Sequence, residues 1–392
     1  MIKTYSYKSI KAGDRVLMRI NANVSITRGK VSESSTHRID ILLPEIKRLL
    51  RKRVKLVLMT HVGRPIGSDG SLTTKPIAYY LSKKLRQEVL FTPQITGTET
   101  ASIINSAKNG SIIVLENLRF DIREKKNNAI FAKSLARLGD LYINNAFGVC
   151  HRKHASIHAI TRYIPSFAGQ LLVREVKELS KRLKEPAVLI VGGIKLETKV
   201  PVIEHLAPQV NDILTAGGVA VAMVSAERKK RFFAGAQKIS EVDQRTAFSI
   251  LQKYSDKIHL PVDFLIQSKV SKKKKLIQHE SMTLKASDKL FDIGPLSVQH
   301  YLNVLKGART VIWNGPMGQV EWKQAQNGTL DLARGIVRMR RARTVVGGGD
   351  TVTFLEKEGL TKKFSFVSSG GGAMLEFLAG NALPGLEVLK TL

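Results

Sequence analysis

The sequence predicts an α/β protein with two domains, each built on a doubly wound parallel sheet. The chain has 392 residues, enough for two or three domains of about 150 residues each. Short apolar segments rich in β-branched residues alternate with segments of helical periodicity, and polar or glycine-rich turns separate them. Because the apolar segments are continuous, they are typical of parallel strands that helices cover on both faces.

In the first half of the chain, apolar segments predict four strands and periodic segments predict two helices. The strands are expected at 16–20, 54–60, 111–115 and 141–143, and the helices at 39–51 and 129–138. The second half continues the alternation, with strands expected at 187–191, 212–216, 310–313, 344–346 and 364–367. Each half therefore predicts a sheet of its own, in a Rossmann-like arrangement.

The domain boundary is expected between residues 166 and 186. Pro165 ends one element and Pro186 precedes the next strand, while residues 175–184 have the charged, amphipathic pattern of a helix, which we interpret as a bridge between the domains. The resulting division is an N-terminal domain 1–168, an interdomain helix and hinge 169–185, a C-terminal domain 186–368 and a segment 369–392 that can pack back on the N-terminal domain.

Composition excludes two classes of protein. Apolar residues make up 43% and charged residues 24%, close to the globular average, so wholesale disorder is excluded. The longest nearly uncharged stretch, 213–226, is shorter than the roughly 18 to 20 apolar residues of a membrane helix, and no secretory signal opens the chain. The single cysteine, Cys150, agrees with a reducing compartment. We expect a cytoplasmic protein without a membrane partner.

The charge is strongly positive, since 63 Lys and Arg against 32 Asp and Glu give +31. Such a charge favours polyanionic partners, but the bases are spread along the whole chain. The one dense run, 272–275, is typical of a solvated loop. Contact with nucleic acid is therefore expected only as nonspecific, charge-driven binding.

Ligands of open α/β sheets bind at the carboxyl ends of the strands. In the first half, the residues there are cations and amides: Asn21, Asn23, Arg38, His61, Arg64, Arg119, His151 and Arg152. Guanidinium groups bind carboxylates and phosphates through paired hydrogen bonds, so these residues predict a site for a small molecule that carries both groups. One such arginine alone is typical of an ordinary surface, and the prediction depends on their repetition.

Glycines follow the strands of the second half, at 192–193, 217–218, 294, 315, 347–349 and 370–372. Several lead into helices, whose N-terminal N–H groups and dipole attract phosphate. We interpret this half as a cradle for nucleotide phosphates. Neither a GxxxxGK[ST] loop nor a GxGxxG fingerprint is present, so the cradle differs from Walker and standard dinucleotide sites.

Charged residues complete this cradle. Lys195 and Lys199 lie four residues apart, so they can share one helical face and direct two ammonium groups at a transferring phosphoryl group. A solvated helix face is the alternative interpretation. Asp350 in GGGDT is a candidate ligand for phosphate-bound magnesium, and Thr351 is a candidate helix cap or phosphate contact.

With these residues in place, the sequence resembles phosphoglycerate kinase along nearly its whole length. Ten collinear motifs carry the resemblance: RINANVS (19–25), HVGRP (61–65), LENLRF (115–120), NNAFGVCHRKHAS (144–156), VGGIKLETK (191–199), LPVDF (260–264), DIGP (292–295), VIWNGPMG (311–318), GGGDT (347–351) and SSGGGAMLEFLAG (368–380). The resemblance implies a monomeric glycolytic enzyme. Its N-terminal domain would bind 3-phosphoglycerate, its C-terminal domain would bind MgATP or MgADP, and a hinge would close for direct phosphoryl transfer.

The resemblance also assigns site residues by position. The implied acid site comprises Asn21, Ala22, Asn23, Arg38, His61, Val62, Gly63, Arg64, Arg119, His151 and Arg152. The implied nucleotide site comprises Lys195, Lys199, Gly294, Asn314, Glu321, Gly348, Gly349, Asp350 and Thr351, with Asp350 on Mg²⁺ and Glu321 on the ribose. The groups implied to stabilise the transferring phosphoryl are Arg38, Lys195, Lys199, Gly349 and Gly372. Positioning and electrostatics would then supply the catalysis.

Three positions depart from the family pattern. Asn21 and Asn145 stand where the family has aspartate, and Ser25 stands where it has proline. An amide retains an acceptor and gains a donor, so Asn21 can keep a hydrogen bond to a substrate hydroxyl. Losing a charged hydrogen bond costs about 1.5 to 3 kcal/mol. Removing a carboxylate, in contrast, reduces the repulsion of a polyanionic substrate.

The leading hypothesis is a phosphotransferase with a carboxyl group as acceptor. The alternative is a phosphoglycerate-kinase-like protein of weakened activity that binds nucleic acid or acidic surfaces, which the charge and Asn21 favour. A dehydrogenase on the same fold class is a third, weaker hypothesis. All matched arginines and lysines are retained, which favours the enzyme.

Overall fold

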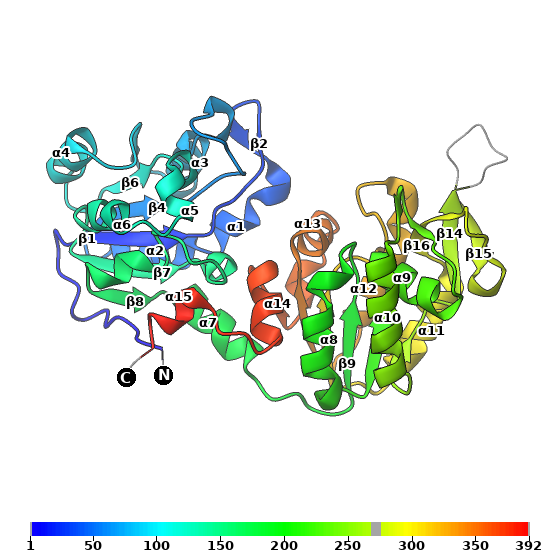
Figure 1. Ribbon diagram of the computed structural model, residues 1–392. Coiled ribbons are helices and arrows are strands. Elements are labelled where there is room, and N and C mark those ends of the chain that lie inside the picture. Colours follow the sequence, from blue (N-terminus) through cyan, green and yellow to red (C-terminus); the bar gives the residue numbers. More distant parts are fainter. Residues whose placement is uncertain (1, 268–275, 391–392) are drawn as a thin grey trace. The chain divides into compact units, whose positions relative to one another are not determined.

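The computed structural model describes residues 2–267 and 276–390 and divides the chain into two compact units (Figure 1). The first unit comprises the residues up to Leu179 together with those from Ala382, and the second comprises Ser180–Asn381. The lysine run at 272–275 lies outside the described residues. Each unit contains a six-stranded sheet in which every neighbouring pair of strands is parallel. The predicted fold class is confirmed.

The sheet of the first unit separates two apolar layers. Its strand order is β5 (Val89–Thr92), β6 (Ile112–Leu115), β4 (Lys55–Met59), β1 (Arg15–Ile20), β7 (Leu141–Asn145) and β8 (Ser166–Ala168). Along β1, Val16, Met18 and Ile20 belong to one apolar cluster and Leu17 to another, because successive side chains point to opposite faces. The strand sequence is continuously apolar because both faces of the sheet are covered by apolar layers.

Helices of the first unit supply the covering layers. They are α1 (His37–Asp40), α2 (Leu43–Leu50), α3 (Lys75–Leu85), α4 (Thr98–Ser106), α5 (Ile122–Lys125), α6 (Ala129–Ala136), α7 (Gln170–Leu179) and α15 (Pro384–Glu387). Ile46 of α2 and Ile77 of α3 pack on one face of the sheet, and Phe131 of α6 packs on the other.

Two helix predictions are wrong in their bounds. The single helix expected at 39–51 is divided into α1 and α2, because Pro44 has no N–H to donate to the carbonyl of Asp40 and its ring clashes with that carbonyl in a continuous helix. The helix expected at 175–184 is α7 and ends at Leu179. Its buried residues, Leu172, Glu175 and Leu179, occupy one face, whereas residues 180–184 contain a single apolar side chain. That this helix bridges two domains remains a prediction.

The two chain ends meet within the first unit. The N–H of Lys3 donates to the carbonyl of Leu389 at 2.7 Å, and Ile2 forms an antiparallel bridge with Lys390. The N–H of Gly385 donates to the carbonyl of Cys150 at 2.9 Å, and a Cβ on this glycine would lie 3.0 Å from the Cys150 sulfur. The residues from Ala382 are thus an integral part of this unit.

The second unit holds two sheets. The parallel sheet has the order β13 (Ile258–His259), β10 (Asp212–Thr215), β9 (Ala187–Val191), β17 (Thr310–Asn314), β18 (Arg343–Gly347) and β19 (Phe366–Val367). A mixed sheet follows the order β12 (Gln237–Lys238), β11 (Phe233–Ala234), β16 (Lys289–Ile293), β14 (Asp263–Gln267) and β15 (Leu276–Glu280). The mixed sheet was not predicted, since two of its strands have only two residues each.

The α-helices of the second unit are α8 (Val200–Leu206), α9 (Gly217–Glu227), α10 (Glu241–Tyr254), α11 (Pro295–Val304), α12 (Asn327–Ile336), α13 (Gly349–Lys357) and α14 (Gly372–Leu378). The most apolar of them, α9, has 11 residues and is buried almost all round. Within 2–267 and 276–390, no helix combines the length and apolarity that a membrane crossing requires.

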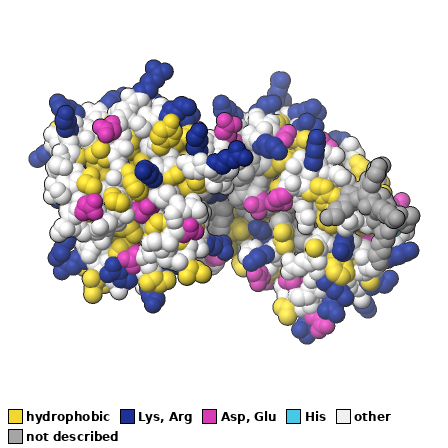
Figure 2. All heavy atoms as spheres, turned by 90° about the horizontal axis from the view of Figure 1, so that it is seen from above, with side chains coloured by type: hydrophobic (Ala, Val, Ile, Leu, Met, Phe, Trp, Pro, Cys, Tyr) yellow, Lys and Arg dark blue, Asp and Glu magenta, His cyan; other side chains and the backbone are white. Residues whose placement is uncertain are grey.

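The positive charge is distributed over the surface. Figure 2 shows Lys and Arg side chains scattered over the face in view, with fewer Asp and Glu between them. This distribution agrees with the spread of bases along the sequence.

Candidate functional site

Polar contacts tie together the loops that follow β1, β4 and β6 of the first unit. The side-chain oxygen of Asn23 accepts from the N–H of Gly63 at 2.8 Å, and its backbone carbonyl accepts from Nη1 of Arg38 at 2.8 Å. Nη1 of Arg119 donates to the carbonyl of Gly63 at 2.5 Å. Gly63 has φ of +65°, and a Cβ there would lie 2.9 Å from Leu72. These four predicted site residues form one connected group.

Arg119 lies close enough to Arg19, Arg64 and Arg152 for their charges to repel one another. Burial, together with the charges of Arg152 and Arg19, lowers the pKa of Arg119 to about 10. Burial and the charge of Arg64 lower the pKa of Arg152, whose Nε donates to Nε2 of His151 at 3.0 Å. An anionic ligand would relieve this repulsion, so the group is suited to bind carboxylate and phosphate.

Beneath the cations lies a buried layer that the sequence did not reveal. Arg19 is fully buried, and its Nε donates to the hydroxyl of Ser156 at 3.1 Å. That hydroxyl donates to the carboxylate of Glu124 at 2.6 Å, and the N–H of Ser156 donates to the same carboxylate at 2.9 Å. Glu124 is thus a buried carboxylate among the arginines. Burial raises its pKa, and the charges of Arg19 and Arg119 oppose this effect.

The buried layer also sets the state of two histidines. Nη2 of Arg19 lies 2.8 Å from Nδ1 of His61, and burial together with Arg19 and Arg119 holds the pKa of His61 well below its usual range. Burial and the same arginines lower the pKa of His154 to about 3. Both imidazoles are therefore neutral near pH 7.

The remaining residues of the predicted acid site occupy the same strand ends. Asn21 is nearly buried directly after β1, and the N–H of Ala22 donates to the Thr60 hydroxyl at 3.2 Å. The N–H of Val62 donates to the side chain of Asn117 at 3.3 Å. These contacts position backbone rather than side chains, so Ala22 and Val62 act through the shape of their loops.

Asn145 has a structural position instead. Its Nδ2 donates to the buried carboxylate of Glu45 at 2.6 Å, and its Oδ1 accepts from the N–H groups of Leu171 and Leu172 at 3.0 and 3.2 Å. These two N–H groups belong to the first turn of α7, where they lack partners within the helix. Asn145 therefore connects β7 to the start of α7.

The second unit contains a cavity of about 520 Å³ at the carboxyl ends of its parallel strands. Most of the predicted nucleotide residues line it: Lys195, Lys199, Asn314, Glu321, Gly348, Gly349, Asp350 and Thr351, together with Gly372. Gly294 does not line this cavity. A Cβ on Gly294 would lie 2.1 Å from the Asp263 carboxylate, so this glycine lets β14 approach the start of α11.

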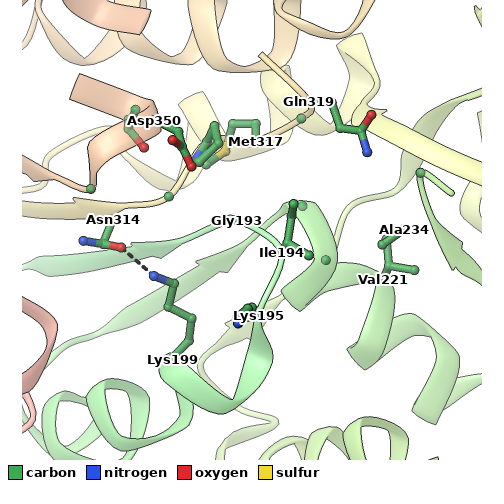
Figure 3. A pocket seen from close by; sticks show the side chains of 18 of the residues that line it. Gly193, Ile194, Lys195, Lys199, Val221, Ala234, Asn314, Met317, Gln319 and Asp350 are labelled. Carbon is green, nitrogen blue, oxygen red and sulfur yellow. Dashed lines mark hydrogen bonds between the residues drawn. The ribbon is translucent and has the colours of Figure 1, made fainter. Parts of the chain in front are cut away.

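Lys199 is the buried cation of the cavity. Its Nζ donates to Oδ1 of Asn314 at 2.7 Å (Figure 3). Burial lowers the pKa of Lys199 to about 8, against the opposing effect of the Asp350 carboxylate. The residue remains mostly charged at pH 7.

The prediction that Lys195 and Lys199 share a helical face is wrong. They flank the short 3₁₀ helix Leu196–Thr198 (η6), in which residues four apart point in different directions. Lys195 is 72% exposed, and its Nζ lies 3.9 Å from Glu197. Both lysines line the cavity, but only Lys199 is buried in it.

Glycines allow the loops of the cavity to pack backbone against backbone. A Cβ on Gly192 would lie 2.2 Å from the carbonyl of Pro316, and one on Gly217 would lie 2.8 Å from the carbonyl of Gly193. The φ of Gly217 is +57°, which side chains also disfavour. These glycines are required for loop packing before any ligand binds.

Two buried polar atoms in the cavity remain available to a ligand. Nδ2 of Asn314 and Oγ1 of Thr351 have no hydrogen-bond partner among the described residues. A Cβ on Gly348 would lie 3.4 Å from Oγ1 of Thr351 and 3.6 Å from Nδ2 of Asn314, so the three residues form one corner. Phosphate oxygens would satisfy such donors.

The same corner fits a magnesium ion carried by a nucleotide. Asp350 is an exposed carboxylate in the first turn of α13, and no group of three His, Cys, Asp or Glu in the described part of the chain could enclose a metal. Mg²⁺ bound to phosphates keeps several waters and takes one or two protein carboxylates. A single carboxylate beside the phosphate donors fits that mode.

The mixed sheet adds residues that sequence reasoning missed. Ala234, Gly235, Phe291 and Gln319 line the cavity, and so does Asp292, whose pKa burial raises to about 8. No periodic sequence pattern predicted that these residues line the cavity, because β11 has only two residues and Gln319 lies in a loop.

Comparison with known proteins then identifies the family. Residues 8–381 match the family model described as phosphoglycerate kinase. The chain belongs to the phosphoglycerate kinase family. It is 34% identical over 384 residues to the phosphoglycerate kinase of Leptospira biflexa, covering 96% of both chains, and 36% identical over 377 residues to that of Aquifex aeolicus, covering 95% of this chain and 94% of the relative.

Solved phosphoglycerate kinase structures agree with this assignment. The structure from Coxiella burnetii is 31% identical with a TM-score of 0.80, and the match covers 98% of each chain. The structure from Pyrococcus horikoshii OT3 is 29% identical with a TM-score of 0.85, and the match covers 96% of each chain. The predicted family is confirmed, the chain is a kinase of glycolytic type, and none of these comparisons favours the nucleic-acid-binding alternative.

Proposed function

We propose that the chain catalyses reversible, Mg²⁺-dependent transfer of a phosphoryl group between ATP and the carboxylate of 3-phosphoglycerate. The observation that carries this proposal is the cavity of the second unit, in which Lys199, Asn314 and Thr351 present a buried cation and unpartnered polar atoms beside Asp350. Membership of the phosphoglycerate kinase family supports the choice of substrates.

The first unit would bind the acid. Arg119 and Arg152, whose pKa values are lowered by burial and mutual repulsion, would pair with its anionic groups. Neutral His61, with Nδ1 facing Arg19, would donate from Nε2. Asn21 would bind the hydroxyl group in place of the family's aspartate.

The second unit would bind the nucleotide. Lys199 and the N–H groups at the start of α13 would contact its phosphates, Glu321 would contact the ribose, and the mixed-sheet residues would border the base. Asp350 would hold Mg²⁺, which neutralises phosphate charge when bound.

In the transfer, a carboxylate oxygen of the acid attacks the γ-phosphorus of ATP. A new O–P bond forms while the bond to the bridging oxygen breaks, and ADP leaves with that bond's electron pair. The negative charge on the transferring phosphoryl group would be stabilised by Arg38, Lys195, Lys199 and the N–H groups of Gly349 and Gly372. We also propose that the enzyme acts as a cytoplasmic monomer, which sedimentation and fractionation would test.

The test is ATP-dependent phosphorylation of 3-phosphoglycerate with Mg²⁺, coupled to reduction of the acyl phosphate. Wild type should turn over, and Lys199→Met should lose about 100- to 1,000-fold in kcat/KM. The exposed Lys108→Met is the matched control and should retain full activity. A wild type without turnover, or a Lys199→Met variant as active as the control, would refute the proposal.

A further inference from the structure

The second unit has a basic surface at the edge of its parallel sheet opposite the nucleotide cavity. The cavity lies at the carboxyl ends of β9, β17 and β18. The segments that enter β9, β17, β18 and β19 are 180–186, 306–309, 337–343 and 361–365, and in a parallel sheet they all lie at the amino edge. Since β9 has five residues, the two edges are about 15 Å apart.

Hydrogen bonds join these four segments into one surface. The N–H of Arg309 donates to the carbonyl of Pro186 at 2.7 Å, and the N–H of Arg343 donates to the carbonyl of Arg309 at 2.8 Å. The N–H of Thr344 donates to the hydroxyl of Ser365 at 3.0 Å. Segments far apart in the sequence therefore lie side by side.

The side chains of this surface are predominantly cationic. Its exposed cations are Lys181, Arg182, Lys184, Lys306, Arg309, Arg338, Arg340, Arg341, Lys362 and Lys363. Glu185 is the one acid in the four segments. Within the described residues, Arg338, Arg340 and Arg341 take part in no ion pair. The charges of these three arginines are therefore not neutralised by ion pairs within the described residues.

We propose that this amino-edge surface binds the phosphate backbone of double-stranded nucleic acid without sequence preference. Half of its exposed cations are arginines, whose guanidinium groups pair with phosphates in bidentate geometry. None of the exposed large apolar side chains among the described residues lies in the four segments. The surface thus lacks the aromatic groups that stack on single-stranded bases and the apolar groups that insert into a lipid bilayer.

The surface is separate from the proposed kinase site, and none of its cations lines the cavity. Binding at the amino edge is therefore independent of the proposed catalytic role. Phosphate contacts of this kind release counterions, so affinity should fall steeply with salt, by a slope of about 0.9 for each contact.

The test measures fluorescence anisotropy of labelled 20-base-pair DNA and RNA duplexes between 50 and 300 mM KCl. The variant is Arg338→Gln/Arg340→Gln/Arg341→Gln in the full chain. The matched control, Arg28→Gln/Arg137→Gln/Arg162→Gln, removes three exposed arginines from the first unit. We expect wild type and control to bind, and the variant to lose about tenfold or more in affinity at 100 mM KCl and about 2 to 3 in salt slope.

Kinase turnover and thermal unfolding report whether the variant is folded, and both should match wild type. A second variant, Lys362→Gln/Lys363→Gln, tests the same surface at a different segment and should weaken binding too. Equal weakening by variant and control, or no duplex binding by wild type, would overturn the proposal. Tighter, arginine-dependent binding to vesicles of 70% phosphatidylcholine and 30% phosphatidylserine would overturn it in favour of a membrane. Failure of kinase turnover in wild type would refute the proposed function. The duplex-binding measurement would still test the proposed nucleic-acid surface.

Discussion

Nη2 of Arg19 lies 2.8 Å from Nδ1 of His61 in the layer beneath the cations of the first unit. A guanidinium group can only donate, so Nδ1 of His61 must accept and its proton must be on Nε2. Because burial and the arginines hold the pKa of His61 well below its usual range, we predict a neutral imidazole. ¹⁵N NMR of labelled histidines should show the Nε2–H tautomer without titration from pH 8 to 5. A titration midpoint inside that range would contradict this.

Glu124 should link the stability of the first unit to the affinity of its acid site. Glu124→Gln removes the buried negative charge near Arg19 and Arg119, and breaking such a group should cost about 3 to 5 kcal/mol of unfolding free energy. Without the Glu124 carboxylate, less of the positive charge of Arg19 and Arg119 is balanced within the protein. The site should then bind an anion more tightly, so KM for 3-phosphoglycerate should fall. Urea unfolding and KM measure the two effects, with the exposed Glu33→Gln as control. Unchanged stability would rule out this role.

Nucleotide binding should weaken above pH 8. Burial lowers the pKa of Lys199 to about 8, so its charge is present below that pH and is lost as pH rises through it. KM for ATP should therefore increase between pH 7.5 and 9.5 in wild type. In Lys199→Arg the cation persists, and the profile should be flat over this range. The same rise in both proteins would show that another group titrates.

The amide of Asn145 should be required for stability, because its neighbour Glu45 is a buried carboxylate. Asn145→Asp would place two carboxylates in contact at the start of α7, where Nδ2 of Asn145 now lies 2.6 Å from Glu45. We expect a loss of about 3 to 5 kcal/mol in unfolding free energy. Glu45→Gln combined with Asn145→Asp should recover most of it, because one carboxylate is then replaced by an amide.

The loss in Asn145→Asp should depend on pH. Burial raises the pKa of Glu45 in the folded protein, and a second carboxylate would raise it further. A group whose pKa is raised on folding contributes stability at pH below its unfolded pKa of about 4.5 and loses it as pH rises. Urea unfolding should therefore show a larger loss at pH 8 than at pH 5.5. Equal losses would mean that packing, not charge, is disturbed.

Much of the fold and of the site was predictable, because a buried parallel strand is apolar throughout and its ligand-binding residues follow directly after it in the sequence. The continuous apolar pattern of 187–191 and 310–313 located β9 and β17, and the residues after them line the cavity. His61 and Arg119 were found in the same way. Each of these inferences needed only the residue's own neighbours in the sequence.

The rest depends on contacts between distant residues. Arg19 lies within an apolar strand, and its partner Ser156 is 137 positions away. The start of α7 is bonded to Asn145, about 25 residues earlier. Lys195 and Lys199 follow helical spacing, but the chain between them forms only a 3₁₀ turn. Spacing alone indicates which residues are near in sequence, and not what they meet in the fold.

The bond between Lys3 and Leu389 has a consequence for how the protein is made. The ribosome completes residues 180–381 before it has added the last contacts of the first unit, which come from Ala382 onward. The first unit therefore cannot form these last contacts until the whole of the second unit has been synthesised.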